Sequence, residues 1–338
     1  MPLLGMFSND IAIDLGTANT LIYMKGKGIV LNEPSIVTYD VTSRKIIAIG
    51  EESKKMMGRV HKELNTIRPM KDGVIADFEI AEGMIKEFIK KISSSWMPSR
   101  RIVICVPSGI TEVEKRAVRD TAEHAGAKEV YLISEPMAAA IGIGLDVMAP
   151  YGNMIVDIGG GTTEIAVIAL SGITNGTSIR IAGDELTDAI IRFFRNNHNI
   201  LIGERTAEEI KCQVGSVMPL KEEVIIEVKG RDLVAGIPKI TEVSSIEIRE
   251  SLNAPVNQMI EAVRVALEKT APELASDLLD RGIFLTGGGA LIKGLDERIK
   301  METGVPVYVA EDPLTAVARG TGKVLEDLDY YKKVLLRR

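Results

Sequence analysis

The sequence predicts an α/β fold of two lobes that face each other, because the same short element occurs twice. One copy covers residues 11–20 and the other covers 155–164. Each copy is an apolar strand that ends in an aspartate, Asp14 or Asp157, followed by a turn of small residues and a second apolar strand. The chain has 338 residues, and single hydrophobic cores stop growing at about 250 to 300 residues. We therefore expect two lobes, each opened by one copy.

Strands and helices alternate through the first lobe. Residues 101–107 form a continuous apolar run, which is typical of a buried strand. The next helix begins with Thr111 and Glu114, which form a capping box, and it is expected to end at Gly126. A strand over 130–133 follows, and then a helix that begins near Pro136, since proline suits the first turn of a helix. This alternation predicts sheets that are covered by helices.

The second lobe begins at the strand that carries Asp157. A strand over 282–286 precedes three glycines at 287–289, and a helix is expected from about 291 to 303. Two stretches, 33–76 and 184–243, interrupt the α/β pattern and are predicted to be inserted subdomains. The first contains a hairpin pattern at 36–39 and 45–49, and the second contains a hairpin candidate at 223–232. The remaining segments would form the lobe cores: 1–32, 77–146 and 318–338 in the first lobe, and 147–183 and 244–317 in the second.

The composition excludes several classes of protein. The hydrophobic fraction of 46% and the charged fraction of 26% are those of an ordinary globular protein. The net charge of -6 gives no basic field, so we expect no nucleic-acid partner. No apolar run is long enough to cross a bilayer, and the N-terminus lacks the basic start of a signal peptide. The histidines show no metal-ligand spacing, and Cys105 and Cys212 are predicted to be reduced, buried thiols of a cytosolic protein.

The two repeated turns suit a polyphosphate and a metal ion. Glycine lets the backbone approach phosphate oxygens and direct its amides at them. Asp14 and Asp157 are predicted to hold Mg²⁺, largely through water, because Mg²⁺ keeps much of its hydration shell. A single turn of this kind is more often an ordinary hairpin, but two of them, one per lobe, favour a nucleotide site. The predicted contact residues in the turns are Gly16, Thr17, Ala18, Asn19, Gly159, Gly160, Gly161 and Thr162.

Two further features would complete such a site. No GxxxxGK[ST] motif is present, which excludes a P-loop protein. The segment Gly287, Gly288, Gly289 and Ala290 is interpreted as a place where a purine and its ribose lie against the backbone at a helix start. Glu135 follows the strand at 130–133, where a carboxylate can position or deprotonate a water molecule. An acid at a helix N-terminus can equally well serve the helix dipole, but its place between the two turns favours catalysis.

These residues together resemble the actin-like ATPase superfamily, which includes actin, the heat-shock chaperone ATPases and sugar kinases. The bacterial cell-shape proteins are its most similar members, and the resemblance covers essentially the whole chain. It is carried by segments 14–20, 31–35, 67–77, 157–164, 180–184, 285–290 and 310–320.

The resemblance implies a four-part actin-like fold with ATP and Mg²⁺ in the central cleft. It implies hydrolysis by phosphoryl transfer to water, with Glu135 and Thr162 orienting the water and Asp14 and Asp157 completing the catalytic set. It also implies that the helix with Glu208, Glu209, Ile210 and Lys211 flanks the adenosine. From the residues alone, Glu208 and Lys211 are an ordinary i,i+3 surface pair.

A short segment around the only tryptophan is predicted to contact a membrane. Trp96 and Met97 lie beside Arg100 and Arg101, so the apolar side chains would enter the headgroup boundary while the arginines meet anionic lipid. The alternative is that Trp96 packs on its own core. The resemblance implies a second anchor near the N-terminus, and many subunits would be needed for firm binding. The second anchor would consist of Leu3, Leu4, Met6 and Phe7.

The leading hypothesis follows from the resemblance. It is an ATP-dependent filament, cytoplasmic and peripheral on the inner face of the cell membrane, that maintains rod shape by organising lateral wall synthesis and hydrolyses ATP slowly. Its expected partners are further copies in head-to-tail contact, anionic lipid and the wall-elongation membrane proteins.

Three alternatives compete with this hypothesis. A small-molecule kinase of the same superfamily would need a second pocket and a base for the substrate hydroxyl, and the sequence has no spare aspartate motif to supply that base. A chaperone would need a separate substrate-binding domain after the ATPase fold. A catalytically silent scaffold is disfavoured by the intact Asp14, Glu135, Asp157 and Thr162.

Overall fold

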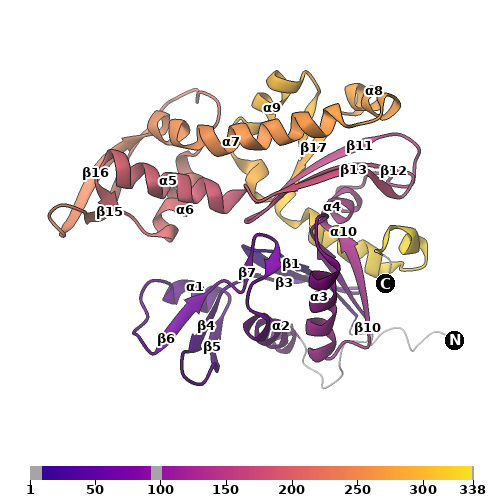
Figure 1. Ribbon diagram of the computed structural model, residues 1–338, viewed down its shortest axis with the longest axis horizontal. Helices are drawn as coiled ribbons and strands as arrows, with labels where there is room; N and C mark the ends of the chain where they lie inside the picture. The colour runs from indigo at the N-terminus through magenta and orange to yellow at the C-terminus, as the bar shows by residue number, and fades with distance from the viewer. Residues whose placement is uncertain (1–9, 93–100, 337–338) are drawn as a thin grey trace.

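The computed structural model describes residues 10–92 and 101–336, and it shows two halves stacked on each other (Figure 1). Each half contains a five-stranded sheet with the same topology: β3-β2-β1-β9-β10 in the first half and β13-β12-β11-β17-β18 in the second. In both sheets the first three strands pair antiparallel and the last two join in parallel. The prediction of a duplicated, two-lobed α/β fold is confirmed.

The bounds of these strands place both aspartates inside the first strand of their half. The first sheet consists of β1 (Ile11–Leu15), β2 (Asn19–Met24), β3 (Gly28–Pro34), β9 (Arg101–Val106) and β10 (Glu129–Ser134). The second consists of β11 (Asn153–Ile158), β12 (Thr163–Ala169), β13 (Gly172–Ile179), β17 (Ile283–Thr286) and β18 (Val307–Val309).

Helices cover the first sheet and enclose its core. Helix α2 (Phe78–Ile92) buries Phe88 and Met84 against the sheet, and α3 (Glu112–His124) lies beside it. Burial of one such large side chain stabilises the fold by about 1.5–3 kcal/mol. The predicted capping box is confirmed, because the Thr111 side chain accepts a hydrogen bond from the Glu114 amide and the Glu114 carboxylate accepts one from the Thr111 amide.

The second half contains the helices α5 (Gly183–Asn197), α6 (Glu204–Val214), α7 (Ser245–Glu268), α8 (Pro272–Arg281) and α9 (Leu295–Thr303). In Figure 1, α7, α8 and α9 lie above the sheet, and α5 and α6 lie to the left of it. These helices surround a core that includes Phe194, Leu252 and Leu285.

The helix expected over 291–303 begins four residues later than predicted. The glycine segment instead forms the short 3-10 helix η2 (Gly288–Leu291), and the left-handed Gly294 separates it from α9. Two further 3-10 helices are η3 (Pro313–Thr315) and η4 (Tyr330–Val334).

Two helices cross between the halves, α4 (Glu135–Gly142) and α10 (Ala316–Glu326) (Figure 1). They approach so closely that only glycine fits at the crossing. A methyl group added at Gly142 would lie 1.8 Å from the carbonyl oxygen of Ala316, and one at Gly320 would lie 1.7 Å from that of Ala138. Both distances are far below van der Waals contact, so these two glycines set the spacing of the helices.

Smaller sheets extend each half. The hairpin predicted at 36–39 and 45–49 is confirmed as β4 (Val37–Asp40) and β5 (Ile46–Ile49). The prediction that 223–232 forms a hairpin by itself is wrong, because this segment supplies only the strand β15 (Ile225–Asp232), whose antiparallel partner is β16 (Pro238–Ser244). The boundaries of the four subdomains stay predictions.

The elements of the smaller sheets and the adjoining helix α1 are β4 (Val37–Asp40), β5 (Ile46–Ile49), α1 (Glu51–Met56), β6 (Leu64–Ile67), β7 (Met70–Lys71), β8 (Val74–Ile75), β14 (Ile200–Leu201), β15 (Ile225–Asp232) and β16 (Pro238–Ser244).

The two cysteines differ in their surroundings. Cys105 is buried, as predicted, but the prediction for Cys212 is wrong because its side chain is exposed. Helix α6 turns Ala207, Ile210 and Val214 inward, and Cys212 lies on another face of the helix.

None of the helices within 10–92 and 101–336 has the length and apolar character that a membrane crossing requires. The predicted membrane contacts Leu3, Leu4, Met6, Phe7, Trp96 and Met97 lie outside the described residues.

Candidate functional site

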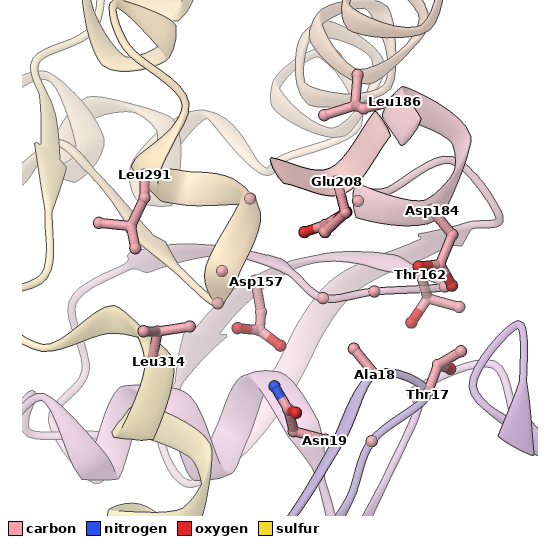
Figure 2. A pocket seen from close by; sticks show the side chains of 18 of the residues that line it. Thr17, Ala18, Asn19, Asp157, Thr162, Asp184, Leu186, Glu208, Leu291 and Leu314 are labelled. Carbon is pink, nitrogen blue, oxygen red and sulfur yellow. The ribbon is translucent and has the colours of Figure 1, made fainter. Parts of the chain in front are cut away.

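A cavity of about 450 Å³ lies between the two halves, and most of the predicted site residues line it. Figure 2 shows Thr17, Ala18 and Asn19 on one side of it and Asp157 and Thr162 on the other. Three predicted contact residues, Glu209, Ile210 and Ala290, are not part of the lining. The lining residues that the sequence predicted are Asp14, Gly16, Thr17, Ala18, Asn19, Glu135, Asp157, Gly159, Gly160, Gly161, Thr162, Glu208, Lys211, Gly287, Gly288 and Gly289.

The two repeated turns have the same internal hydrogen bond. The amide of Gly16 donates to the carbonyl of Asn19 at 3.1 Å, and the amide of Gly159 donates to that of Thr162 at 2.9 Å. A methyl group at Gly160 would lie 2.8 Å from the Ala18 side chain, so the turns touch across the cleft. This close approach needs glycine, and it places the backbone of both turns at one point of the cavity.

Three carboxylates lie around that point, and the side chain of Asp157 is buried. Asp157 accepts a hydrogen bond from the Thr286 hydroxyl at 2.8 Å, and burial raises the pKa of Asp157 to about 7. Burial raises the pKa of Asp14 to about 6, against the lowering effect of the Cys105 thiol at 3.2 Å. The pKa of Glu135 is raised well above its usual range by burial and then by the neighbouring carboxylates, Glu164 first. The site therefore concentrates negative charge that a cation would neutralise.

The residues present fit a magnesium ion that takes most of its ligands from elsewhere. Within 10–92 and 101–336, no group of three or more His, Cys, Asp or Glu side chains is arranged to hold a metal. Asp14 and Asp157 supply one carboxylate from each half. Such a pair suits Mg²⁺, which is commonly bound by one or two carboxylates, water and phosphate oxygens.

The raised pKa of Asp157 gives a test in the absence of nucleotide and magnesium. The pKa of Asp157 is about 7 in the folded state against an ordinary 3.8. Above pH 7 the side chain is therefore ionised and destabilises the fold, whereas below pH 4 it is protonated and this cost is absent. We expect Asp157→Asn to be more stable than the unsubstituted chain at pH 8. Its advantage should shrink by up to about 1.4 kcal/mol for each pH unit as the pH falls toward 4. Denaturant unfolding across this range measures it, and a difference independent of pH would contradict the buried carboxylate.

Of the pair Glu208 and Lys211, the lysine is buried and the glutamate is half exposed. Lys211 is 8% exposed, and its ammonium group contacts Glu208 at 2.7 Å, the Gly183 carbonyl at 2.8 Å and the Thr187 hydroxyl at 3.0 Å. The amide of Gly183 in turn donates to the Gly159 carbonyl at 3.1 Å. Lys211 thus connects α6 through the start of α5 to the second turn, while the Glu208 side chain points into the cavity (Figure 2).

The predicted residues outside the cavity lining have other environments. Glu209 forms an exposed ion pair with Arg205 at 2.9 Å. Ile210 and Ala290 are buried in the hydrophobic core of the second half. Their predicted contact with a nucleotide stays a prediction.

Sequence reasoning missed the apolar end of the cavity. Leu291 in η2 and Leu314 in η3 line it and lie on the same side in Figure 2, with Leu186 farther away. Leu291 and Leu314 are about half exposed, at 54% and 51%. Two exposed leucines beside a glycine segment suit a flat aromatic base. The only signal in the sequence was their closeness to 287–289 and Pro313.

Arg68 and Asp184 also line the cavity without having been predicted as site residues. Arg68 of the first half forms an ion pair at 2.7 Å with Glu204 of the second half. The Arg68 guanidinium also counteracts the rise in the pKa of Asp184 that burial causes. The halves are therefore joined by an ion pair at the rim of the cavity.

We expect Glu204→Gln to accelerate nucleotide release about two- to fivefold, because a half-exposed ion pair contributes up to about 1 kcal/mol. Stopped-flow displacement of a fluorescent ATP analogue measures the rate. Glu261→Gln is the matched control, since it removes an exposed ion pair with Arg264 within α7, away from the cavity lining. Equal release rates for the two variants would show that the Arg68 pair does not retain nucleotide.

Comparison with known proteins places the chain in a family. The family model described as MreB/Mbl protein matches residues 8–333. The chain belongs to the MreB/Mbl family. Among curated MreB/Mbl relatives, cell shape-determining protein MreB of Escherichia coli (strain K12) is 55% identical over 333 residues, covering 97% of this chain and 96% of the relative. Cell shape-determining protein Mbl of Bacillus subtilis (strain 168) is 49% identical over 329 residues, covering 97% and 99%.

The fold is that of solved MreB structures. The crystal structure of MreB5 of Spiroplasma citri bound to AMPPNP aligns with a TM-score of 0.91 at 36% identity, covering 96% of this chain and 98% of that one. The actin-like fold expected from the sequence is thus confirmed, and this MreB/Mbl chain has the fold of a nucleotide-bound relative.

Proposed function

We propose that this chain is an actin-like ATPase that assembles into filaments with ATP and maintains rod shape by organising lateral wall synthesis. The observation that carries the proposal is that two equivalent turns, Asp14, Asp157 and Glu135 all line one cavity. The family relatives named cell shape-determining proteins support the cellular role. The solved relative bound to AMPPNP supports ATP as the ligand.

The geometry supports a specific division of labour in hydrolysis. The backbone amides of the two turns would bind the phosphates, and the apolar end with Leu291 and Leu314 would hold the base. Bound Mg²⁺ would neutralise phosphate charge, held by Asp14 and Asp157 largely through water. Glu135 and Thr162 would orient the attacking water, and the raised pKa of Glu135 makes it a stronger base. The water oxygen would then bond to the γ-phosphorus as the bond from that phosphorus to the β–γ bridging oxygen breaks, so that ADP leaves, and the water proton would pass to Glu135.

The proposal extends to where the filament works. The chain would lie on the inner face of the cell membrane, with Trp96, Met97, Leu3, Leu4, Met6 and Phe7 in contact with anionic lipid. Each contact is small, so firm binding would come from many subunits that bind together. The wall-elongation membrane proteins are the proposed partners on that surface.

Co-sedimentation with anionic vesicles, with and without magnesium and ATP, tests polymer and membrane binding together. Filaments lying on vesicles in negative stain, only with ATP, are the expected result. Trp96→Ser should reduce vesicle binding while Trp96→Phe retains it, and vesicles of neutral lipid serve as the second control. A protein that stays monomeric in solution under all conditions would refute the proposal and favour a small-molecule kinase.

A further inference from the structure

Glu164 is a buried carboxylate for which the proposed mechanism has no role. It lies on β12, paired across the sheet with Asp157, and it is fully buried. It is not among the residues that line the cavity. Leaving a carboxylate in such a place costs several kcal/mol unless its oxygens are satisfied, so its partners are informative.

Both oxygens of Glu164 accept hydrogen bonds, and the two donors come from different halves. The hydroxyl of Ser178 on the neighbouring strand β13 donates to Oε1 at 2.5 Å. The backbone amide of Ser108, two residues after β9 in the first half, donates to Oε2 at 3.0 Å. Hydrogen bonds to an ionised acceptor are roughly twice as strong as neutral ones. Glu164 therefore links β12 and β13 of the second half to the segment after β9 in the first half.

The segment that contains Ser108 lies next to Thr162, one of the proposed catalytic residues. A methyl group at Gly73 would lie 2.8 Å from the Pro107 side chain and 3.1 Å from that of Thr162, so Pro107, Gly73 and Thr162 pack together. The amide of Gly73 also donates to the Thr17 hydroxyl at 3.0 Å. A shift of Ser108 would move Pro107, and with it the packing that holds Thr162 and the first turn.

We propose that Glu164 is a positioning residue: by holding the Ser108 amide it fixes the first half against the second, so that Thr162 and Glu135 face the same water molecule. This inference rests on the proposed ATP hydrolysis. It assigns Glu164 to turnover and not to nucleotide affinity, because no side-chain atom of Glu164 lines the cavity.

Three variants separate the roles of the two hydrogen bonds. Glu164→Ala removes both, and Ser178→Ala removes only the bond within the second half. Glu164→Gln keeps a neutral acceptor for Ser108 and loses the charge. If the lost hydrogen bond to a charged group is expressed fully in the transition state, the rate of the chemical step falls about 10- to 100-fold. We expect kcat to fall about 10- to 100-fold in Glu164→Ala, while its KM for ATP stays within about twofold of the unsubstituted chain. In Glu164→Gln we expect kcat to fall about three- to tenfold, and in Ser178→Ala less than about threefold.

Hydrogen exchange at the Ser108 amide gives a readout that does not depend on activity. Protection should be lost in Glu164→Ala and retained in Glu164→Gln and Ser178→Ala. Unchanged protection in Glu164→Ala, or lost protection with normal kcat, would overturn the inference. If Glu164→Ala does not fold, a normal kcat in Glu164→Gln overturns it. If the unsubstituted chain itself does not hydrolyse ATP, the proposed function is refuted, and the role of Glu164 in turnover is refuted with it. That result is obtained before any variant is made.

Discussion

Replacing Glu135 with glutamine is expected to slow ATP hydrolysis by about 10²- to 10⁴-fold while ATP still binds. Glu135 lines the cavity between the two turns, and burial with the nearby carboxylates raises its pKa well above the usual range. Glutamine keeps the size of the side chain and removes its ability to accept a proton. Because only the ionised form is a base, hydrolysis by the unsubstituted chain should also decline as the pH falls through the raised pKa.

Phosphate release in a single turnover, measured beside the affinity for a fluorescent ATP analogue, tests this expectation. Glu129→Gln is the matched control: Glu129 starts β10, the strand that leads into Glu135, is exposed, and accepts a hydrogen bond from the Tyr131 hydroxyl. Normal phosphate release from Glu135→Gln would refute its role as base. A parallel loss of ATP binding would mean that Glu135 supports the shape of the site and not the chemical step.

Replacing Gly142 or Gly320 with alanine is expected to destabilise the fold by about 3 kcal/mol or more, since overpacking commonly costs 1–3 kcal/mol. The added methyl groups would lie 1.8 Å and 1.7 Å from backbone carbonyl oxygens of the partner helix. Neither oxygen belongs to a flexible side chain that can turn away. Relief requires α4 and α10 to separate, which would also disturb Glu135 at the other end of α4.

Denaturant unfolding measures this cost. Gly172→Ala is the control, because its methyl group would meet only the Ala169 carbonyl oxygen at 3.8 Å, an ordinary contact. Its change should stay within about 1 kcal/mol. If Gly142→Ala unfolds at the same denaturant concentration as Gly172→Ala, the helices tolerate a wider crossing than the structure has.

The sequence predicts the parts of the site that depend on local chemistry. Asp14 and Asp157 could be found because strand, acid and glycine turn are contiguous and occur twice. The capping box at Thr111 is local in the same way. The start of α9 was missed because Gly294 adopts a left-handed conformation, with φ of 80°, that breaks a run which otherwise reads as helical. The exposure of Cys212 was predictable in principle from the spacing of Ala207, Ile210 and Val214.

The remaining site residues depend on contacts between distant segments. Arg68 and Glu204 are 136 positions apart in the sequence, and nothing local marks either as a partner of the other. Lys211 looks like half of a surface pair until the fold brings the Gly183 carbonyl to its ammonium group. Glu164 was visible inside the second motif, but its bond to the Ser108 amide exists only once two sheets are assembled. Such roles follow from the tertiary arrangement.

The repeated strand order divides the proposed nucleotide-contact surface between the two halves, with one turn and one aspartate on each. A ligand can reach both turns only at one separation of the halves, so its binding energy depends on that separation. Contacts with neighbouring copies or with a surface that favour the same separation are then thermodynamically linked to the ligand. By reciprocity, the factor by which such contacts tighten nucleotide binding equals the factor by which nucleotide tightens them.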